Sequence, residues 1–445
     1  MKKKLFICLC VVIAICVAVL TIFLLTSEGP LEIYAADGKL LARLDKTSIH
    51  EPGTWPEDCR AYIDVAITQA AQLLMEEKDC TEDEAKTLLA SRGYRLDTAF
   101  DSAVQAAVAA AYATYNEQEL EMGCAVTDLN GKLLAVFSSH ADRNYATAQT
   151  PPYSSFKPLS VYAPALEADL IHFSSVFEDS PVTRVEGKPW PSNATKRYTN
   201  APVTVAQAVR QSLNTVAVRC MDTVRLEHSF AFLEERFGLE LTGEKARAES
   251  LGQSEVRGNV ALGHLDYGVA PVEMAGYFQC FGNGGSYTPP QAVTALSTSS
   301  GKTLYTFSYE PTRVLTEENA AVMNRLLQQV TAPGGTGSAA FDPDKPTAGK
   351  TGTGKLGNWF VGVTPGYSCA VWHGNQPEGN IAAAIFSEAR KGFPATETDS
   401  FPVAEGMAEI LYCTESGLEA TSGCPNTGIG IYASEKELPA CNMHN

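Results

Sequence analysis

Ser154-Ser155-Phe156-Lys157 is the stretch from which the fold and chemistry of this chain can be worked out. At helical spacing, side chains three residues apart lie about 5–6 Å from each other on one face, so the Ser154 hydroxyl could reach the Lys157 amine. A serine hydroxyl is a poor nucleophile near neutral pH unless a base takes its proton. The ordinary alternative is a helix N-cap serine beside a surface lysine. Ser299-Ser300-Gly301-Lys302, in a turn-like run, has the same spacing, so this pattern needs support from elsewhere in the chain.

The residues that follow predict a helix that begins at Ser154. Pro158 to Glu167 are mostly apolar, and proline is tolerated in a first helical turn. The backbone N–H groups and the dipole at a helix start favour developing negative charge. Ser154 would therefore lie where an oxyanion is stabilised.

The N-terminus predicts a single membrane anchor. Met1-Lys2-Lys3-Lys4 precedes Leu5 to Leu25, a run without charged residues that is long enough to cross a hydrocarbon core of ~30 Å. Thr26 to Pro30 has no clear small-residue cleavage site, which favours an anchor over a cleaved signal peptide. We expect residues 1–4 in the cytoplasm and the chain after the anchor outside.

Composition and charge exclude some classes of protein. The chain has 445 residues, 45% of them hydrophobic, which supports a substantial core, and its net charge of −17 argues against a nucleic-acid partner. We predict no cofactor and no metal site, because the sequence lacks Cys-x-x-Cys and His-Glu-x-x-His and its seven histidines are scattered. The cysteines beyond the anchor are odd in number, so at least one is unpaired within the chain. Spacing favours a Cys413–Cys424 disulfide, and buried free thiols remain the alternative.

Hydrophobic periodicity predicts a mixed α/β chain. Strands near the beginning and end, with helices between them, favour one central antiparallel sheet of about five strands with helices on both faces. The predicted helices are 58–78, 81–91, 99–115, 204–222, several within 223–280, and 316–331; the predicted strands are 123–127, 132–137, 347–353, 358–363, 368–372 and 381–386, with small hairpins at 31–42 and 291–307.

Two further motifs follow Ser154 in chain order, Ser212-Leu213-Asn214 and Lys350-Thr351-Gly352-Thr353. Alone, the first is a pair of capping or solvent-facing polar residues and the second a strand that enters a glycine-rich loop. Together they supply what acyl transfer needs. Lys350 would lower the pKa of Lys157 by like-charge repulsion, Ser212 would relay a proton, Asn214 would bind a substrate amide, and Gly352 would let a peptide approach the strand.

These three motifs resemble those of penicillin-binding proteins and serine β-lactamases. Beyond the motifs, the chain resembles the transpeptidase domain of the bifunctional, high-molecular-mass penicillin-binding proteins. The similarity is carried by Gly93 to Asp101 with Gln105, Ser212 to Phe237, Gly335-Thr336-Gly337, Trp359-Phe360-Val361-Gly362, and Cys413 to Leu418.

The resemblance implies a role for each motif residue. Ser154 would be the acylated nucleophile, Lys157 its base and Ser212 the proton relay, while Asn214 would contact the substrate amide. The substrate's terminal carboxylate, or that of a β-lactam, would be bound by Lys350, Thr351 and Thr353, and the N–H groups of Ser154 and Thr353 would form the oxyanion hole.

The chain also departs from that family. No Glu-Asp-x-x-Phe-type signature of a glycosyltransferase domain is found before Met122, so we expect no polymerising activity. Tyr153 stands where the family usually has glycine. The predicted divisions are a cytoplasmic tail 1–4, an anchor 5–25, a juxtamembrane region 26–92 formed by the flanks of a lost domain, a transpeptidase domain 93–412 and a cysteine-containing tail 413–445.

The resemblance implies a bacterial, membrane-anchored D,D-transpeptidase on the outer face of the cell membrane. It would cross-link peptidoglycan stem peptides that end in D-Ala-D-Ala, would be inhibited covalently by β-lactams, and would work with a separate glycan polymerase. The alternatives are a D,D-carboxypeptidase or β-lactamase of the same fold, although no Glu-x-x-Leu-Asn is present, or a catalytically quiet wall-synthesis scaffold, for which Tyr153 is the sequence hint.

Overall fold

The computed structural model describes residues 29–444 apart from 116–119, 252 and 375–378. The predicted anchor, residues 5–25, lies outside the described residues. Among the residues that are described, no helix is both long and apolar enough to cross a membrane. The chain divides into two compact units, one reaching to Asp101 and including Gln291–Ser308, the other made of Ser102–Pro290 and the residues from Tyr309 onward.

The first unit is built around a five-stranded sheet in the order β12-β11-β3-β1-β2. The predicted hairpin at 31–42 is confirmed, and a capping box of Thr81 and Glu84 begins the second helix as expected. The hairpin at 291–307, predicted as part of the transpeptidase domain, completes this sheet instead. The elements are β1 (Leu31–Tyr34), β2 (Leu40–Leu44), α2 (Arg60–Lys78), α3 (Glu82–Ser91), β3 (Arg95–Thr98), β11 (Val293–Ser297) and β12 (Thr303–Thr306).

The second unit contains the predicted central sheet, which is antiparallel with the order β14-β15-β16-β4-β5. Its strands are β4 (Met122–Asp128), β5 (Leu133–Ser138), β14 (Ala348–Gly354), β15 (Gly357–Val363) and β16 (Tyr367–His373). The early and late strands meet where β4 pairs with β16, with Val126 opposite Cys369. β14, which carries the Lys350 motif, is an edge strand.

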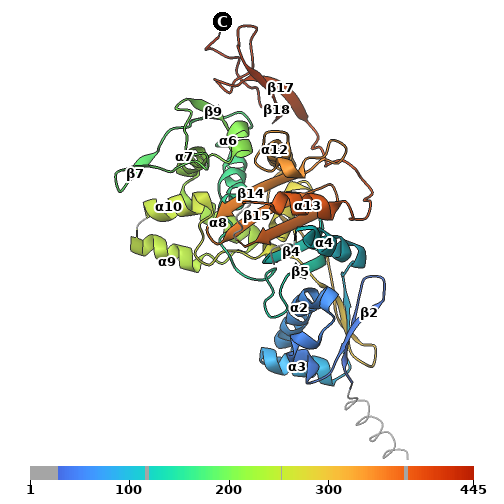
Figure 1. The fold of residues 1–445 in the computed structure, drawn as a ribbon. Helices are drawn as coiled ribbons and strands as arrows, with labels where there is room; N and C mark the ends of the chain where they lie inside the picture. The colour runs from blue at the N-terminus through green and yellow to red at the C-terminus, as the bar shows by residue number, and fades with distance from the viewer. Residues whose placement is uncertain (1–28, 116–119, 252, 375–378, 445) are drawn as a thin grey trace, which may run out of the picture. The chain divides into compact units, whose positions relative to one another are not determined.

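Helices cover both faces of this sheet (Figure 1). α4 (Ser102–Tyr115) and α13 (Ala382–Arg390) pack on the face that holds Val126, in one buried apolar cluster. α11 (Pro271–Phe278) covers the other face, where the Thr127 hydroxyl donates to Ala275 O at 3.5 Å. Alternation of side chains along β4 explains this division.

The strand predicted at 381–386 is wrong, because this segment is the start of α13. Ala382, Ala383, Ile385, Phe386 and Ala389 are all buried, a spacing that fits one face of a helix. Alanine also favours helix over strand. The apolar run at 381–386 is too short for its helical period to be recognised from the sequence.

The remaining elements surround the sheet. The helix predicted at 204–222 is broken into two at Ser212, and the polar run 177–202 contains short strand pairs that were not predicted. The helices are α5 (Ala163–Glu167), α6 (Val205–Gln211), α7 (Asn214–Val224), α8 (Leu226–Phe237), α9 (Thr242–Leu251), α10 (Gln253–Leu262) and α12 (Glu317–Thr331); the strand pairs are β6 (Val176–Glu178) with β9 (Pro202–Thr204), β7 (Thr183–Val185) with β8 (Lys188–Trp190), β10 (Ser286–Tyr287) with β13 (Thr312–Arg313), and β17 (Met407–Cys413) with β18 (Thr427–Ala433).

Candidate active site

The nucleophile segment is helical but irregular. Tyr153–Phe156 form a 3-10 turn and Pro158–Tyr162 a π-helical turn before α5 begins. Ser154 is half-buried, whereas every other residue from Pro152 to Leu166 is buried. The hydroxyl that we predicted as nucleophile is therefore the accessible point of an otherwise enclosed segment.

Gly352 allows the edge strand β14 to lie directly against this segment. A Cβ atom at Gly352 would lie 2.3 Å from Pro152 O and 3.1 Å from Ser155 N. Sequence reasoning assigned this glycine to the approach of a peptide. In the structure it permits the close packing of β14 on the nucleophile turn, which brings two of the predicted motifs together.

The Lys157 amine lies in the interior and faces the second motif. Its side chain is fully buried, and its Nζ donates to Ser212 O at 3.0 Å and to Asn214 Oδ1 at 2.6 Å. Within the described residues it forms no ion pair. A neutral amine has two N–H donors and one lone pair, so these bonds use both donors and leave the lone pair for another group.

Lys350 lies on the other side of Ser212. It is also fully buried, and its Nζ donates to Ser212 Oγ at 2.8 Å and to Thr351 O at 3.1 Å. Ser212 thus contacts both amines, one through its carbonyl and one through its hydroxyl. The three motifs predicted from the sequence converge on one place.

Both lysines have lowered pKa values. Burial holds the pKa of Lys157 well below its ordinary value, and the nearby charge of Lys350 lowers it further. Burial lowers the pKa of Lys350 to about 7. Like-charge repulsion was predicted as the cause of the lowered pKa of Lys157; in the structure loss of hydration contributes more.

No hydrogen bond joins Ser154 to Lys157 among the residues described here. The hydroxyl of the neighbouring Ser155 is buried and donates to Pro152 O at 2.6 Å. Ser154 and Lys157 are three residues apart across a 3-10 turn, in which such side chains lie one above the other. The predicted nucleophile and base therefore share one face of the turn, but the hydroxyl of Ser154 and the amine of Lys157 are not hydrogen-bonded in this structure.

The break between α6 and α7 positions Ser212 and Asn214. Ser212 ends α6 in the left-handed region at φ 56°, which stops the helix that the sequence pattern predicted as continuous. Asn193, which sequence reasoning missed, accepts from Asn214 N at 2.8 Å and donates to Asp179 Oδ1 at 2.7 Å. Burial alone would raise the pKa of Asp179, but the hydrogen bonds it receives, led by that of Thr215, lower it. A charged, buried acceptor thus fixes the start of α7.

The end of β14 carries the other predicted binding residues. The Thr351 hydroxyl donates to Thr336 Oγ1 at 2.9 Å, and Thr353 is exposed. Asn380, which was also missed, donates to Gly352 O at 2.9 Å and to Thr353 Oγ1 at 3.0 Å. The Thr353 hydroxyl is held at the open margin of the sheet.

Tyr153 connects the nucleophile turn to the loop after β14. Its φ of 51° lies in the left-handed region, which explains why glycine suits this position. The side chain is only 8% exposed, and its hydroxyl accepts from Leu356 N at 3.1 Å. The ring meets His264 edge to face at 5.3 Å, and burial, followed by the charge of Lys157, lowers the pKa of that histidine.

The family model described as the penicillin binding protein transpeptidase domain matches residues 105–390, more than half of the chain. The chain belongs to this family. Penicillin-binding protein 1A of Clostridium acetobutylicum is 30% identical over 363 residues, which are 73% of this chain and 43% of that protein. This chain therefore spans less than half the length of that relative.

Two solved structures of the family share the fold. The D,D-transpeptidase domain of a peptidoglycan glycosyltransferase from Eggerthella lenta has a TM-score of 0.63 and 24% identity, covering 82% of this chain and 98% of its own. The PonA1 protein of Mycobacterium tuberculosis, solved in complex with penicillin V, has a TM-score of 0.63 and 21% identity, covering 78% of this chain and 96% of its own.

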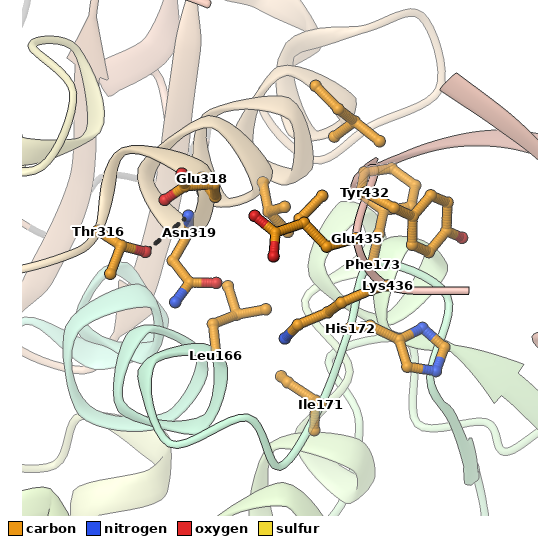
Figure 2. A pocket seen from close by; sticks show the side chains of 13 residues that line it. Leu166, Ile171, His172, Phe173, Thr316, Glu318, Asn319, Tyr432, Glu435 and Lys436 are labelled. Atoms are coloured by element: carbon orange, nitrogen blue, oxygen red, sulfur yellow. Dashed lines mark hydrogen bonds between the residues drawn. The ribbon is translucent and has the colours of Figure 1, made fainter. Parts of the chain in front are cut away.

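A separate pocket of ≈ 290 Å³ is lined by the start of α12, the segment after α5, and the end of β18 with the residues that follow it (Figure 2). Its lining includes Asn319 of α12 and Tyr432 and Lys436 of the C-terminal segment, and it contains none of the predicted site residues. It lies where the C-terminal hairpin of β17 and β18 packs on the second unit.

Proposed function

We propose that the chain is a D,D-transpeptidase that cross-links peptidoglycan through an acyl-enzyme on Ser154. The observation that carries the proposal is the pair of fully buried amines, Lys157 and Lys350, that share Ser212 as hydrogen-bond partner beside the accessible Ser154. Burying such amines without a carboxylate is costly. This free-energy cost is explained if the site needs a neutral amine as its base.

In the acylation step, Ser154 Oγ attacks the carbonyl carbon of the penultimate D-alanine. Lys157 Nζ takes the hydroxyl proton on its lone pair, since its two N–H groups are engaged by Ser212 O and Asn214 Oδ1. The C–N bond then breaks, and the proton passes through the Ser212 hydroxyl to the leaving amine of the terminal D-alanine. The N–H groups of Ser154 and Thr353 would hold the oxyanion.

Lys350 binds the carboxylate of the terminal D-alanine in this proposal. A protonated amine has three donors, and two of them are directed to Ser212 Oγ and Thr351 O. The third remains for the substrate, with the Thr351 and Thr353 hydroxyls at the same strand end. Asn214 would contact the substrate amide through its Nδ2 group, which has two N–H donors and uses one of them on Ser192 O at 2.7 Å.

The amine of a neighbouring stem peptide would resolve the acyl-enzyme, and the polymer places this reaction outside the cell membrane. We infer that residues 5–25 anchor the chain there and that a separate polymerase supplies the glycan strands. Covalent inhibition by β-lactams follows from the same acylation, with the lactam amide in place of the D-Ala-D-Ala bond.

Labelling with a fluorescent penicillin tests this function. We expect the wild-type chain to retain one label through denaturing electrophoresis, and Ser154→Ala to retain none. The matched control is Ser299→Ala, which removes the other serine that precedes a lysine by three residues. It should label like the wild type.

Equal labelling of the wild type and Ser154→Ala would reject the acyl-enzyme. Rapid loss of label with release of hydrolysed penicillin would instead indicate a β-lactamase or carboxypeptidase. A wild-type chain that folds but takes up no label would indicate a scaffold.

A further inference from the structure

Three cysteines and one histidine meet in the C-terminal segment, far from the acyl-transfer site in the sequence. The ligating atoms of Cys413, Cys424, Cys441 and His444 all lie within 4.8 Å of one another. Cys413 ends β17, Cys424 lies in the turn before β18, and Cys441 and His444 belong to the segment that returns beside Glu419. Three separate pieces of chain therefore contribute to one cluster.

The cysteines of this cluster are thiols. Each of the described cysteines is free, so the disulfide predicted between Cys413 and Cys424 is absent from this structure. A disulfide would require a sulfur–sulfur bond of about 2.05 Å. The sequence pattern could not distinguish a pair of bonded cysteines from two members of a larger set.

The spacing of the cluster fits a tetrahedral metal ion. His444 Nδ1 lies 3.5 Å from Cys413 Sγ and 3.4 Å from Cys441 Sγ. Zinc–sulfur bonds of about 2.3 Å and zinc–nitrogen bonds of about 2.0 Å place neighbouring ligand atoms of a tetrahedron about 3.5 Å apart. The imidazole thus presents Nδ1 at the distance that a shared metal ion requires.

The outer partners of the ligands are also in place. His444 Nε2 lies 3.2 Å from Glu415 Oε2, which would hold the proton on Nε2 and leave Nδ1 free to ligate. Thr421 N donates to Cys424 Sγ at 3.3 Å, and the Ser416 hydroxyl donates to Cys441 Sγ at 3.2 Å. Donors directed at sulfur favour the thiolate, which is the form that binds metal.

We propose that Cys413, Cys424, Cys441 and His444 bind one zinc ion. A Cys₃His set is typical of structural zinc, and four protein ligands close the coordination sphere, which leaves no open position for catalysis. Zinc prefers thiolate and imidazole ligands in this geometry. This inference does not depend on the proposed function, since no residue of the cluster belongs to the acyl-transfer site.

The zinc would hold together the C-terminal hairpin and its seat. The Tyr432 hydroxyl donates to Ser174 Oγ at 2.6 Å, and Ser174 Oγ donates to Gly417 O at 2.6 Å, inside the loop that carries the ligands. Tyr432 also lines the pocket in Figure 2. Ordering the loop would therefore order this side of the second unit.

Metal analysis of the full chain tests the site. Protein prepared under reducing conditions and passed through a desalting column is analysed for metals by inductively coupled plasma mass spectrometry. We expect about one zinc per chain in the wild type, and less than a tenth of that in Cys424→Ser and in His444→Ala. The control is Cys80→Ser, which removes a cysteine outside the cluster and should leave zinc unchanged.

Cobalt substitution provides a second measurement on the wild type. Co²⁺ in a tetrahedral thiolate site has intense visible bands and a sulfur-to-cobalt charge-transfer band, and Cys424→Ser should lack both. Far-ultraviolet circular dichroism of each variant shows whether the fold remains, so that loss of zinc cannot be ascribed to unfolding.

The following results would overturn the proposal. They are a folded wild-type chain without zinc, zinc that persists in both ligand variants, and a disulfide between any two of the three cysteines in the reduced preparation, detected by peptide mass mapping. Iron in place of zinc would also overturn it.

Discussion

The acyl-transfer site and the C-terminal cysteine cluster both gather buried or half-buried polar groups from distant segments, but they balance charge in opposite ways. Lys157 and Lys350 are two amines enclosed without a carboxylate, and their pKa values fall. Cys413, Cys424 and Cys441 are thiols grouped with the imidazole of His444, all four ligating atoms lying within 4.8 Å of one another. The first site reduces like charge by losing protons, and the second would do so by binding a cation. The two proposed roles would explain the difference, since a general base must be neutral and cysteine ligates a metal as the thiolate.

Removal of the Lys157 amine should have the largest effect. We expect Lys157→Met to slow acylation by a fluorescent penicillin by about 10²–10⁴-fold, the usual contribution of a general base. The melting temperature should not fall, because the variant removes a buried amine that has no counterion. Stopped-flow fluorescence and thermal unfolding measure the two quantities.

Lys355→Met is the matched control for that experiment. Lys355 is exposed in the turn after β14, so its loss should change neither the rate nor the melting temperature. A large drop in the stability of Lys157→Met would mean that its hydrogen bonds to Ser212 and Asn214 stabilise the fold more than burial of the amine costs.

Metal removal tests the proposed zinc site in the C-terminal cysteine cluster. Lys436 is the one trypsin site in 413–444, and it lies between the last strand and the final ligands. Ligand binding at about 100 times its Kd lowers the population of the open form about 100-fold. We therefore expect a chelator to speed tryptic cleavage at Lys436 by about that factor, and added zinc to restore protection.

The same chelator should leave penicillin labelling at Ser154 unchanged, because the proposed acyl-transfer mechanism uses no metal. Cys424→Ser should be cleaved rapidly with or without chelator. Protection of the wild type that the chelator does not alter would show that the hairpin is held by its protein contacts alone.

Lys350 should give the acyl-transfer site a pH dependence near neutral pH. With a pKa of about 7, Lys350 is protonated at pH 6 and largely neutral at pH 8. Its attraction for a substrate carboxylate is therefore present below pH 7 and is lost as the pH rises. Burial, and then the charge of Lys350, lower the pKa of Lys157, which favours the neutral form that the base needs. We expect the second-order rate constant for benzylpenicillin to fall severalfold from pH 6 to pH 8.

A penicillin methyl ester separates the two lysines in that experiment. The ester has no carboxylate, so its slower acylation should not decrease over the same pH range. A parallel decrease for acid and ester would assign the pH dependence to a group other than Lys350.

The sequence predicted the parts of the molecule that follow regular periods or ordered motifs. The strands of the central sheet are short apolar runs, buried along most of their length and bounded by turn signals such as Asn130-Gly131 and Pro365-Gly366. The serine, asparagine and lysine motifs occur in one chain order, so both features could be found without coordinates. The helix at 382–390 was missed because a short apolar run fits strand and helix equally. Asp179 and Asn193 were missed because irregular loops have no period.

The cysteine cluster could not be predicted from sequence spacing for a similar reason. Only Cys441 and His444 have a spacing typical of metal ligands, and the other two cysteines come from the far ends of a loop. Their meeting depends on the pairing of β17 with β18 and on the bridges that Glu419 makes to Tyr412 and Ala440. Tertiary pairing, rather than local sequence, creates the site.

The smallest expected effect is the contribution of the Tyr153 side chain to the stability of the acyl-transfer site. Tyr153→Phe removes the hydroxyl that accepts from Leu356 N and should lower the free energy of unfolding by about 1 kcal/mol. Tyr153→Gly also relieves the left-handed φ, worth about 1 kcal/mol, but it empties the space of a buried ring, which costs about 3 kcal/mol or more. We therefore expect glycine to be the less stable variant, by urea unfolding, although glycine is the residue that the family usually has here. Greater stability of Tyr153→Gly would mean that backbone strain at residue 153 outweighs the packing of the tyrosine ring. The nucleophile turn would then not be stabilised by packing of that ring, in contrast to the C-terminal cysteine cluster, which zinc would stabilise.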